Sequence, residues 1–241
     1  MVTGAGRGLG RDYARMFAAE GVAVAVVDVD DEAASATAAG IGGGGGRAVA
    51  LGADVADESS TLAMAKRVED EFGRIDILVN NAGIWGDYQR GPLLDVAIDY
   101  WDTVMAVNVR GVLLCSRAVV PAMRRQRWGR IVNISSMGAY MVAGVYGVSK
   151  LAVNQLTYAL ASELGDDGIT VNAVAPGSID NEATRRQVPP QGMETLIAKS
   201  MIKRPGTSAD LFAMIRYLTS DEAGWVTGQT FLANGGFNTR F

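Results

Sequence analysis

A tyrosine and a lysine, Tyr146 and Lys150, stand four residues apart in a stretch whose apolar residues follow helical spacing. Residues at this spacing share one face of a helix, so the lysine cation can lie near the phenol and favour its ionised form. A tyrosine has a pKa of about 10 and needs such help to act as a base near neutral pH. Taken alone, a pair of this kind is more often a packed surface pair than a catalytic one.

The sequence contains no histidine, and this absence narrows the possible chemistry. Ser-His-Asp hydrolysis, general catalysis by histidine and histidine-ligated zinc are all excluded. An acid or base that works near neutral pH must then be a perturbed carboxylate, tyrosine, lysine or cysteine. We predict no metal site, and the one cysteine, Cys115, lies in an apolar run that is typical of a buried core.

A glycine-rich turn lies between a short apolar segment and a helical pattern near the start of the chain. Its glycines are Gly4, Gly6, Gly8 and Gly10. Such a turn lets the backbone approach a pyrophosphate at the positive end of a helix. Asp28 ends the next β-branched run, where a carboxylate can accept hydrogen bonds from an adenosine ribose and repel a 2′-phosphate. Asp28 therefore favours NAD over NADP, whereas Arg7 inside the turn favours NADP.

Short β-branched runs alternate with longer helical patterns along the chain. The predicted strands are 22–27, 48–51, 75–79, 130–134 and 170–173. The predicted helices are 10–20, 31–39, 58–72, 94–127 (with a break near 95–100), 147–164 and 209–220. The runs are almost continuously hydrophobic, as parallel strands covered on both faces require. The pattern predicts an α/β fold of the Rossmann type, a doubly wound parallel sheet with helices on both faces.

Composition and length place this sheet in one globular unit. The 241 residues, 49% hydrophobic and 20% charged, fit a single domain over residues 1–241. Only three residues precede the glycine turn, so the first strand is short; the glycine run 42–46 predicts a surface turn without helix or strand. The polar, proline-containing segment 180–203 is an excursion of the kind that often carries function.

The net charge argues against two classes of partner. At −4 it gives no attraction for nucleic acid or for an anionic membrane surface. The sequence shows no export leader and no apolar stretch of about 18 residues, so we expect a cytoplasmic protein.

With these motifs in place, the sequence resembles the single-domain branch of the short-chain dehydrogenase/reductase family over essentially its whole length. Thr3-Gly4-Ala5-Gly6-Arg7-Gly8-Leu9-Gly10 resembles the family's cofactor turn, Asn80-Asn81-Ala82-Gly83 its sheet-stabilising motif, and Tyr146-Gly147-Val148-Ser149-Lys150 its active-site motif. Asp54-Val55, Asn108, Pro176-Gly177, Gly228-Gln229 and Asn234-Gly235-Gly236 match further motifs in the family's order. Asparagine at 234 stands where aspartate is usual, a change that we expect to concern local structure.

The resemblance implies a seven-stranded sheet and a role for each matching residue. Tyr146 would donate or accept the proton, Lys150 would contact the ribose and tune the phenol, and Asn108 would hold a proton-relay water. The implied cofactor contacts are Gly4, Gly6, Arg7, Gly8, Leu9, Gly10, Asp28, Asp54, Val55, Asn81, Ala82, Gly83, Tyr146, Lys150, Pro176, Gly177 and Ile179. The family is commonly tetrameric, so we expect a homotetramer formed through the helical segments 101–127 and 147–164.

The sequence departs from the family pattern at two places. Ser135 and Ser136 both follow the 131–134 strand, and Ser136 lies 10 positions before Tyr146, which is closer than the family's carbonyl-polarising serine usually lies. We assign that role to Ser136, with Ser135 as the alternative. Where the family often has a threonine that contacts the nicotinamide carboxamide, this chain has Asn181 or Ser178.

Apolar side chains flank the expected catalytic positions. They are Trp85, Tyr88, Met137, Tyr140, Met141 and Val142, together with Met193, Leu196 and Met201 in the excursion. They favour a cyclic or aryl secondary alcohol or ketone as substrate, although each could equally pack in the core or an interface. An NADPH-dependent 3-oxoacyl-thioester reductase is the second hypothesis, and a catalytically silent nucleotide-binding scaffold is the third.

Overall fold

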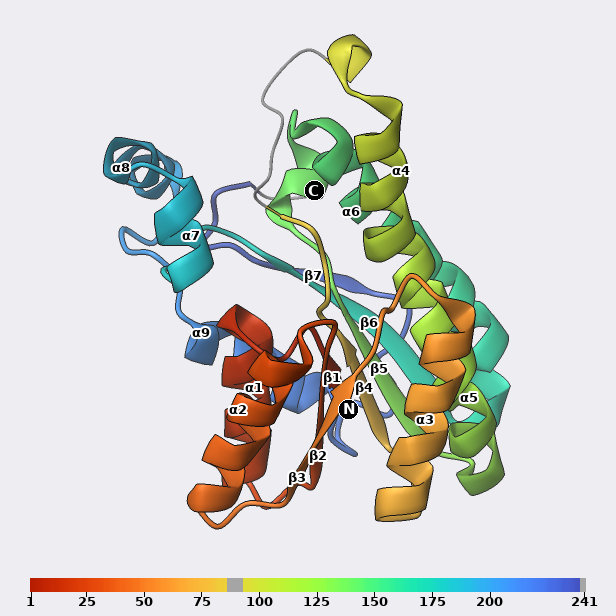
Figure 1. Cartoon of the computed structure of the whole chain (residues 1–241). Helices are drawn as coiled ribbons and strands as arrows, with labels where there is room; N and C mark the ends of the chain where they lie inside the picture. The colour runs from red at the N-terminus through yellow and green to blue at the C-terminus, as the bar shows by residue number, and fades with distance from the viewer. Residues whose placement is uncertain (86–92, 239–241) are drawn as a thin grey trace.

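The computed structural model describes residues 1–85 and 93–238, and its centre is one parallel sheet of seven strands (Figure 1). The strands lie in the order β3-β2-β1-β4-β5-β6-β7. Their bounds are β1 (Val2–Thr3), β2 (Val24–Asp28), β3 (Ala48–Gly52), β4 (Ile77–Asn80), β5 (Gly129–Ile134), β6 (Ile169–Pro176) and β7 (Thr230–Ala233). The predicted doubly wound α/β fold is confirmed.

Helices cover both faces of this sheet (Figure 1). Their bounds are α1 (Gly8–Ala19), α2 (Asp31–Gly43), α3 (Glu58–Phe72), α4 (Ile98–Met105), α5 (Gly111–Gln126), α6 (Gly144–Leu164), α7 (Glu182–Gln187), α8 (Pro190–Lys199) and α9 (Ser208–Leu218). Shorter turns are the 3-10 helices η1 (Leu93–Asp95), η3 (Met137–Tyr140) and η4 (Gly165–Asp167), and a π-helical turn, η2 (Ala106–Arg110).

Two hydrophobic cores hold the helices to the sheet. On one face the core includes Tyr13 of α1 and Leu211 of α9. On the other face it includes Met64 of α3, Met123 of α5 and Leu160 of α6. Because side chains from both faces of the central strands are buried, these strands carry the continuous hydrophobic runs seen in the sequence.

The topology of the sheet indicates which of its edges can bind a ligand. Val2 of β1 pairs with Val26 of β2 on one side and with Val79 of β4 on the other. The chain crosses from β3 to β4, so the connections after β1 and β4 run to opposite faces and leave a crevice at the carboxyl ends of the strands. Open α/β sheets bind ligands at such a switch point.

The glycine run departs from its prediction. Helix α2 continues through Gly42 and Gly43, so the expectation that residues 42–46 contain no helix is wrong for these two. The Asp30 side chain caps the start of α2, and the buried Ile41 anchors its last turn in the core, which offsets the low helix propensity of glycine. Gly44 and Gly45 then end the helix.

The long helical pattern 94–127 is interrupted as predicted, because η1 ends at Asp95 and α4 begins at Ile98. The continuous helical stretch Ile98–Gln126 nevertheless has the length and mean hydropathy, 1.5, of a membrane span, contrary to the sequence expectation. Half of its most apolar window is buried within the molecule, and Val119 and Met123 lie wholly in the core. It therefore packs as a core helix of this fold.

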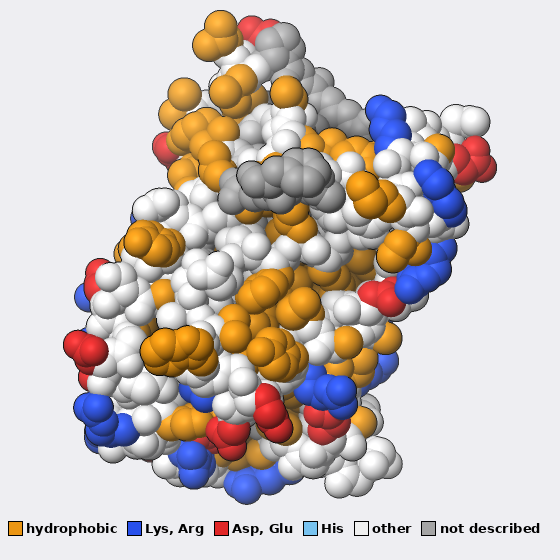
Figure 2. Space-filling view, turned by 180° about the vertical axis from the view of Figure 1, so that it is seen from behind, with side chains coloured by type: hydrophobic (Ala, Val, Ile, Leu, Met, Phe, Trp, Pro, Cys, Tyr) orange, Lys and Arg blue, Asp and Glu red, His pale blue; other side chains and the backbone are white. Residues whose placement is uncertain are grey.

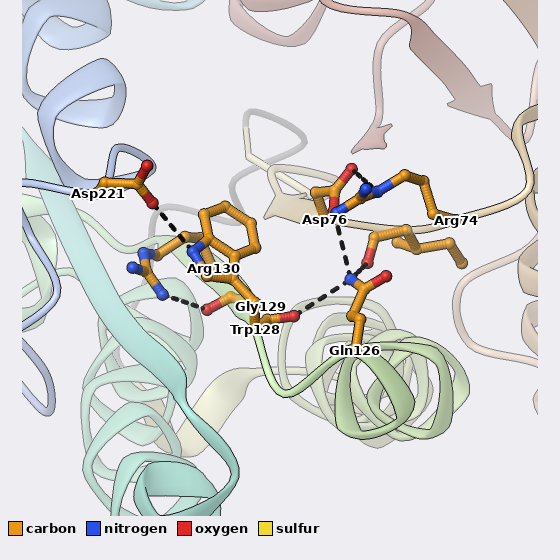
Figure 3. Close-up of polar contacts among 8 residues, drawn as sticks. Arg74, Asp76, Gln126, Trp128, Gly129, Arg130 and Asp221 are labelled. Atoms are coloured by element: carbon orange, nitrogen blue, oxygen red, sulfur yellow. Dashed lines mark hydrogen bonds and ion pairs between the residues drawn. The ribbon is translucent and has the colours of Figure 1, made fainter.

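Polar contacts tie the start of β5, at the edge of the sheet opposite the crevice, to neighbouring segments (Figure 3). Arg130 stacks its guanidinium 4.4 Å from the centre of the Trp128 ring, and its Nε donates a 3.1 Å hydrogen bond to the Ser220 carbonyl. Trp128 Nε1 donates to Asp221 at 3.0 Å. On the other side Gln126 donates to the Trp128 carbonyl at 3.1 Å. The contacts join the start of β5 to the segment after α9.

Candidate active site

Tyr146 and Lys150 lie on α6 with the spacing predicted from sequence. Lys150 is buried, and its Nζ donates a 2.7 Å hydrogen bond to the carbonyl oxygen of Ile134, the last residue of β5. The same Nζ lies 5.7 Å from the centre of the Tyr146 ring. The helix thus presents both side chains at the carboxyl edge of the sheet.

Burial shifts the pKa values of both groups toward their neutral forms. Desolvation raises the pKa of Tyr146 to about 12, although a hydrogen bond with Ser136 acts in the lowering direction. Desolvation lowers the pKa of Lys150 to about 8. In the protein alone, Tyr146 is therefore a phenol at neutral pH, and it needs added positive charge nearby to become a base.

The two candidate serines point to different partners. Ser136 is the N-cap of η3, where its Oγ accepts a 3.0 Å hydrogen bond from the Gly138 amide, and the same side chain hydrogen-bonds Tyr146. Ser135 is buried, and its Oγ donates to the Lys150 carbonyl at 3.3 Å. The structure thus brings Ser136, and not Ser135, to the phenol.

Asn108 lies in the π-helical turn η2 and is fully buried. Its Oδ1 accepts a 2.7 Å hydrogen bond from the Ile84 amide, and its Nδ2 donates to the Ile84 carbonyl at 3.2 Å and to Ser149 Oγ at 3.0 Å. Ser149 Oγ in turn donates to the Tyr146 carbonyl at 2.7 Å. The amide is therefore fixed between the segment after β4 and the first turns of α6.

The glycine turn forms a cradle at the start of α1. A Cβ on Gly10 would lie 2.2 Å from the Gly4 carbonyl oxygen, so this close approach of the backbone requires glycine. Gly8 has a φ of +56° and faces open space. No side chain caps α1, and its first turn holds no acidic residue, so its free amides can receive an anion. This cradle fits the pyrophosphate of a dinucleotide.

Asp28 lies beside this cradle, buried at the end of β2. Its Oδ2 accepts from the Gly6 amide at 2.9 Å, and its Oδ1 accepts from the Asp30 amide at 3.1 Å. A carboxylate has about four acceptor positions, so two remain for ribose hydroxyls. Arg7 is exposed and joins no ion pair in the described part of the chain.

Thr3 is a residue whose role sequence analysis missed. Its Oγ1 accepts hydrogen bonds from the amides of Asn81 and Ala82, each at 3.1 Å. Asn81 Nδ2 returns bonds to the carbonyls of Thr3 at 3.0 Å and Gly4 at 3.1 Å. These bonds fix the glycine turn to the loop after β4, where Gly83 packs near Asn108. A threonine directly before the first glycine was the available signal.

The remaining predicted cofactor contacts lie around the same edge. Asp54 is exposed and Val55 is buried, both just after β3. Gly177 follows β6, where a Cβ would lie 2.5 Å from Asn234 Cα; Ile179 is buried two residues later. Asn234 Oδ1 accepts a 3.0 Å bond from the Gly236 amide, so the asparagine holds a local turn.

The two candidates for a carboxamide contact also differ. Asn181 Oδ1 accepts a 2.8 Å bond from the Thr184 amide and so caps α7. Ser178 Oγ is buried and has no hydrogen-bond partner in the part of the chain that the structure describes.

The apolar residues predicted to line the pocket are spread over three segments. Trp85 and Met141 are partly exposed, Val142 is fully exposed, and Met137 and Tyr140 lie in η3. The excursion 180–203 contains α7 and α8, and α8 carries Met193 and Leu196, with Met201 exposed just beyond it. Tyr88 lies outside the described residues.

A family model described as Enoyl-(Acyl carrier protein) reductase matches residues 4–238. The chain belongs to the short-chain dehydrogenase/reductase family. A solved member, a provisionally named short-chain alcohol dehydrogenase from Sinorhizobium meliloti 1021, superposes with a TM-score of 0.91 and 34% identity over 98% of this chain and 94% of that one. As a short-chain dehydrogenase/reductase, the protein is an oxidoreductase of hydroxyl or carbonyl groups that binds an NAD(P) nucleotide.

Named relatives in this family cover nearly the whole chain. An uncharacterized oxidoreductase of Mycobacterium tuberculosis is 47% identical over 98% of this chain and 95% of its own length. A 3-oxoacyl-(acyl-carrier-protein) reductase of Staphylococcus aureus is 40% identical over 98% and 96%. A subunit of (2S)-((R)-hydroxy(phenyl)methyl)succinyl-CoA dehydrogenase of Thauera aromatica is 37% identical over 98% and 94%.

Proposed function

We propose that this protein is an NAD-dependent oxidoreductase that interconverts an apolar cyclic or aryl secondary alcohol and its ketone, with Tyr146 as the acid and base. The observation that carries the proposal is the contact of Ser136 with the Tyr146 phenol beside the buried Lys150. These three side chains offer a proton carrier, a hydrogen-bond donor and a cation at one place.

The proposed proton steps use these residues directly. In the oxidation direction, Tyr146 first loses its phenolic proton toward solvent, a loss that the positive charge of Lys150 and of the nicotinamide would favour. The phenolate Oη then accepts the hydroxyl proton of the alcohol, and Ser136 Oγ donates a hydrogen bond to the same substrate oxygen. In the reduction direction, Tyr146 Oη returns that proton to the carbonyl oxygen. Lys150 contributes positive charge below its pKa of about 8, and Asn108 holds the path by which the proton reaches solvent. The bound nicotinamide supplies the hydride acceptor or donor.

The cradle at the start of α1 supports a dinucleotide with its pyrophosphate at Gly6, Gly8 and Leu9. Asp28 supports NAD over NADP, because its carboxylate would face the 2′-position of the ribose and repel a phosphate there. Arg7 is the opposing feature, since an exposed guanidinium beside the turn could pair with that phosphate.

The flanking apolar residues support an uncharged ring in the substrate. The relative from Thauera aromatica is named for a substrate with a hydroxy(phenyl)methyl group, which is an aryl secondary alcohol. Burial of one aromatic ring against such residues is worth roughly 2–3 kcal/mol.

The relative from Staphylococcus aureus favours the second hypothesis, a 3-oxoacyl-thioester reductase. A carrier-bound or CoA thioester is anionic and needs exposed cations for docking. The arginines near the end of α5 offer few such cations, because most of them already have a partner. Arg124 pairs with Asp167, Arg125 pairs with Glu69, and Arg127 donates to the Asp166 carbonyl. We therefore rank this hypothesis below the alcohol dehydrogenase.

We also propose a homotetramer built on the exposed apolar surface. The helices α4, η2, α5 and α6 border a groove of about 760 Å³, lined by Asp102, Thr103, Met105, Ala106, Val109, Arg110, Leu113 and Leu156. Exposed Tyr158 and Trp225 add apolar surface, and Figure 2 shows hydrophobic side chains gathered on the face opposite that of Figure 1. The mass in solution tests this assembly.

The test of function is the initial rate at the absorbance band of reduced nicotinamide, with NAD and NADP in turn. The panel holds cyclic and aryl secondary alcohols, their ketones and 3-oxoacyl thioesters. Turnover of the ring substrates with NAD supports the proposal. Turnover confined to thioesters with NADPH supports the reductase, and nucleotide binding without any turnover supports a silent scaffold.

A further inference from the structure

The segment between Ser136 and Tyr146 has an anchor outside the motifs discussed so far. Tyr140, the last residue of η3, accepts a 2.8 Å hydrogen bond at its Oη from Nδ2 of Asn154. Asn154 lies on α6, four residues after Lys150 and eight after Tyr146. At this spacing the three residues share one side of the helix, so the anchor and the candidate catalytic side chains lie on the same element.

The Asn154 amide has one described partner. Its Oδ1 is buried and has no hydrogen-bond partner in the part of the chain that the structure describes. The bond to Tyr140 is therefore the contact that orients this amide between η3 and α6. Its loss would leave Nδ2 without this partner beside an Oδ1 that is already buried and unpaired, and an unpaired buried polar group is the costly case for a hydrogen bond.

The turn that Tyr140 ends also carries Ser136. The Ser136 side chain caps η3 through the Gly138 amide, and a Cβ on Gly138 would lie 3.3 Å from the Tyr146 ring. A Cβ on Gly147 would lie 2.8 Å from the Gly138 carbonyl oxygen, so the backbone of the turn rests directly on α6. Movement of η3 along α6 therefore changes the separation of Ser136 and Tyr146.

Burial alone holds the outer part of this segment weakly. Met141 is 40% exposed and Val142 is fully exposed, and η3 is a single 3-10 turn with few hydrogen bonds of its own. The hydrogen bond between Tyr140 and Asn154 therefore anchors this outer part, which has little buried surface of its own.

We propose that Tyr140 and Asn154 are a positioning pair, which fixes the 137–145 segment on α6 and thereby holds Ser136 Oγ at the Tyr146 phenol. The inference rests on the proposed function, in that the residues it positions are those assigned to proton transfer. Neither member of the pair acts on the substrate oxygen. Both act through the distance between Ser136 and Tyr146.

The test uses Tyr140→Phe, Asn154→Leu and the double variant. Each single change removes the hydrogen bond, and the double variant replaces both partners by apolar groups of similar shape, so it keeps the packing and should fold. Tyr217→Phe is the control, because it removes a hydroxyl from an exposed tyrosine on another helix, α9. The measurements are kcat, KM, the pH profile, NAD affinity and amide hydrogen exchange over residues 137–147.

We expect each single variant to lower kcat roughly three- to tenfold, with the double variant no lower than the worse single one, as coupled residues behave. The rising limb of the oxidation profile should move to higher pH, since the Ser136 bond lowers the pKa of Tyr146. Exchange over residues 137–147 should accelerate, while NAD affinity stays within about twofold of wild type. In a Ser136→Ala background, Tyr140→Phe should have no further effect on kcat.

Three results would overturn the pair. They are unchanged exchange over residues 137–147 in both single variants, an equal further loss of kcat in the Ser136→Ala background, or a change confined to KM that indicates a direct substrate contact. If the wild-type protein shows no turnover, the proposed function fails on its own, and the exchange data still decide whether the pair holds the segment.

Discussion

The ammonium group of Lys150 donates a 2.7 Å hydrogen bond to the carbonyl oxygen of Ile134. Ile134 ends β5, and Ser136 follows it by two residues. The bond therefore fixes α6, which carries Tyr146, against the strand that delivers Ser136. Because Lys150 is buried, the same contact places a group that titrates near neutral pH inside the protein.

Stability should depend on pH through Lys150. Its pKa is lowered from 10.5 to about 8, so between these values the unfolded chain binds more protons and the free energy of unfolding rises with pH. Tyr146 acts in the opposite direction only above pH 10.0, its ordinary pKa. From about pH 8 to about pH 10 we expect the wild type to gain roughly 2 kcal/mol relative to Lys150→Met in urea unfolding. An equal pH dependence of the two proteins would contradict the burial of a titrating lysine.

Ser136 should set the pH profile of oxidation. Its hydrogen bond lowers the pKa of Tyr146, so Ser136→Ala should move the rising limb of kcat/KM to higher pH. The lost donor at the substrate oxygen should also lower kcat by about 100-fold. Ser135→Ala is the matched control, because Ser135 faces the Lys150 carbonyl. A larger effect in the control would reverse the assignment of the two serines.

Asp28 should control the choice of nucleotide. Asp28→Asn keeps an oxygen for the Gly6 amide but removes the charge that repels a 2′-phosphate. We expect the ratio of kcat/KM with NAD to kcat/KM with NADP to fall roughly tenfold or more, since hydrogen bonds to a charged group are worth about 1.5–3 kcal/mol. Glu32→Gln, an exposed change of the same charge, should leave the ratio as it is. An unaltered ratio in Asp28→Asn would shift the assignment to Arg7.

Arg130 should matter for stability and not for catalysis. It is buried at the edge of the sheet away from the candidate active site, where it donates to the Ser220 carbonyl. It also donates to the Gly129 carbonyl (Figure 3). Arg130→Met keeps the length of the side chain but loses these bonds, at a cost of roughly 2–3 kcal/mol. Arg124→Met breaks an exposed ion pair and should cost less than about 1 kcal/mol. Chemical denaturation of the two variants makes the comparison.

The central sheet could be predicted from the sequence because its strands are buried on both faces. β2, β5 and β6 are buried throughout, so their runs stand out. β7 is only half-buried along its length, and it follows from the family resemblance and not from hydrophobic periodicity. In the same way, α7 and α8 bury little surface, so the 180–203 segment lacks an apolar stripe that would reveal two helices.

In the candidate active site, the spacing of residues in the sequence predicted some contacts and not others. The four-residue interval of Tyr146 and Lys150 was sufficient to place both on one helix face. The choice between Ser135 and Ser136 depends on how η3 turns after β5, which no pattern of residues specified. Asn154 continues the spacing of Tyr146 and Lys150, yet its partner Tyr140 lies 14 positions earlier, so the pair is visible only in three dimensions.

The role of Tyr146 is tested most directly by the rate of NAD reduction with a cyclic or aryl secondary alcohol, for wild type and Tyr146→Phe. NAD affinity, measured in parallel by titration, shows whether the variant still binds nucleotide. We predict that Tyr146→Phe binds NAD as the wild type does and loses at least about 1000-fold in kcat, because the change removes the oxygen that we assign to proton transfer. A variant that retains more than about a tenth of the wild-type kcat would contradict proton transfer by Tyr146.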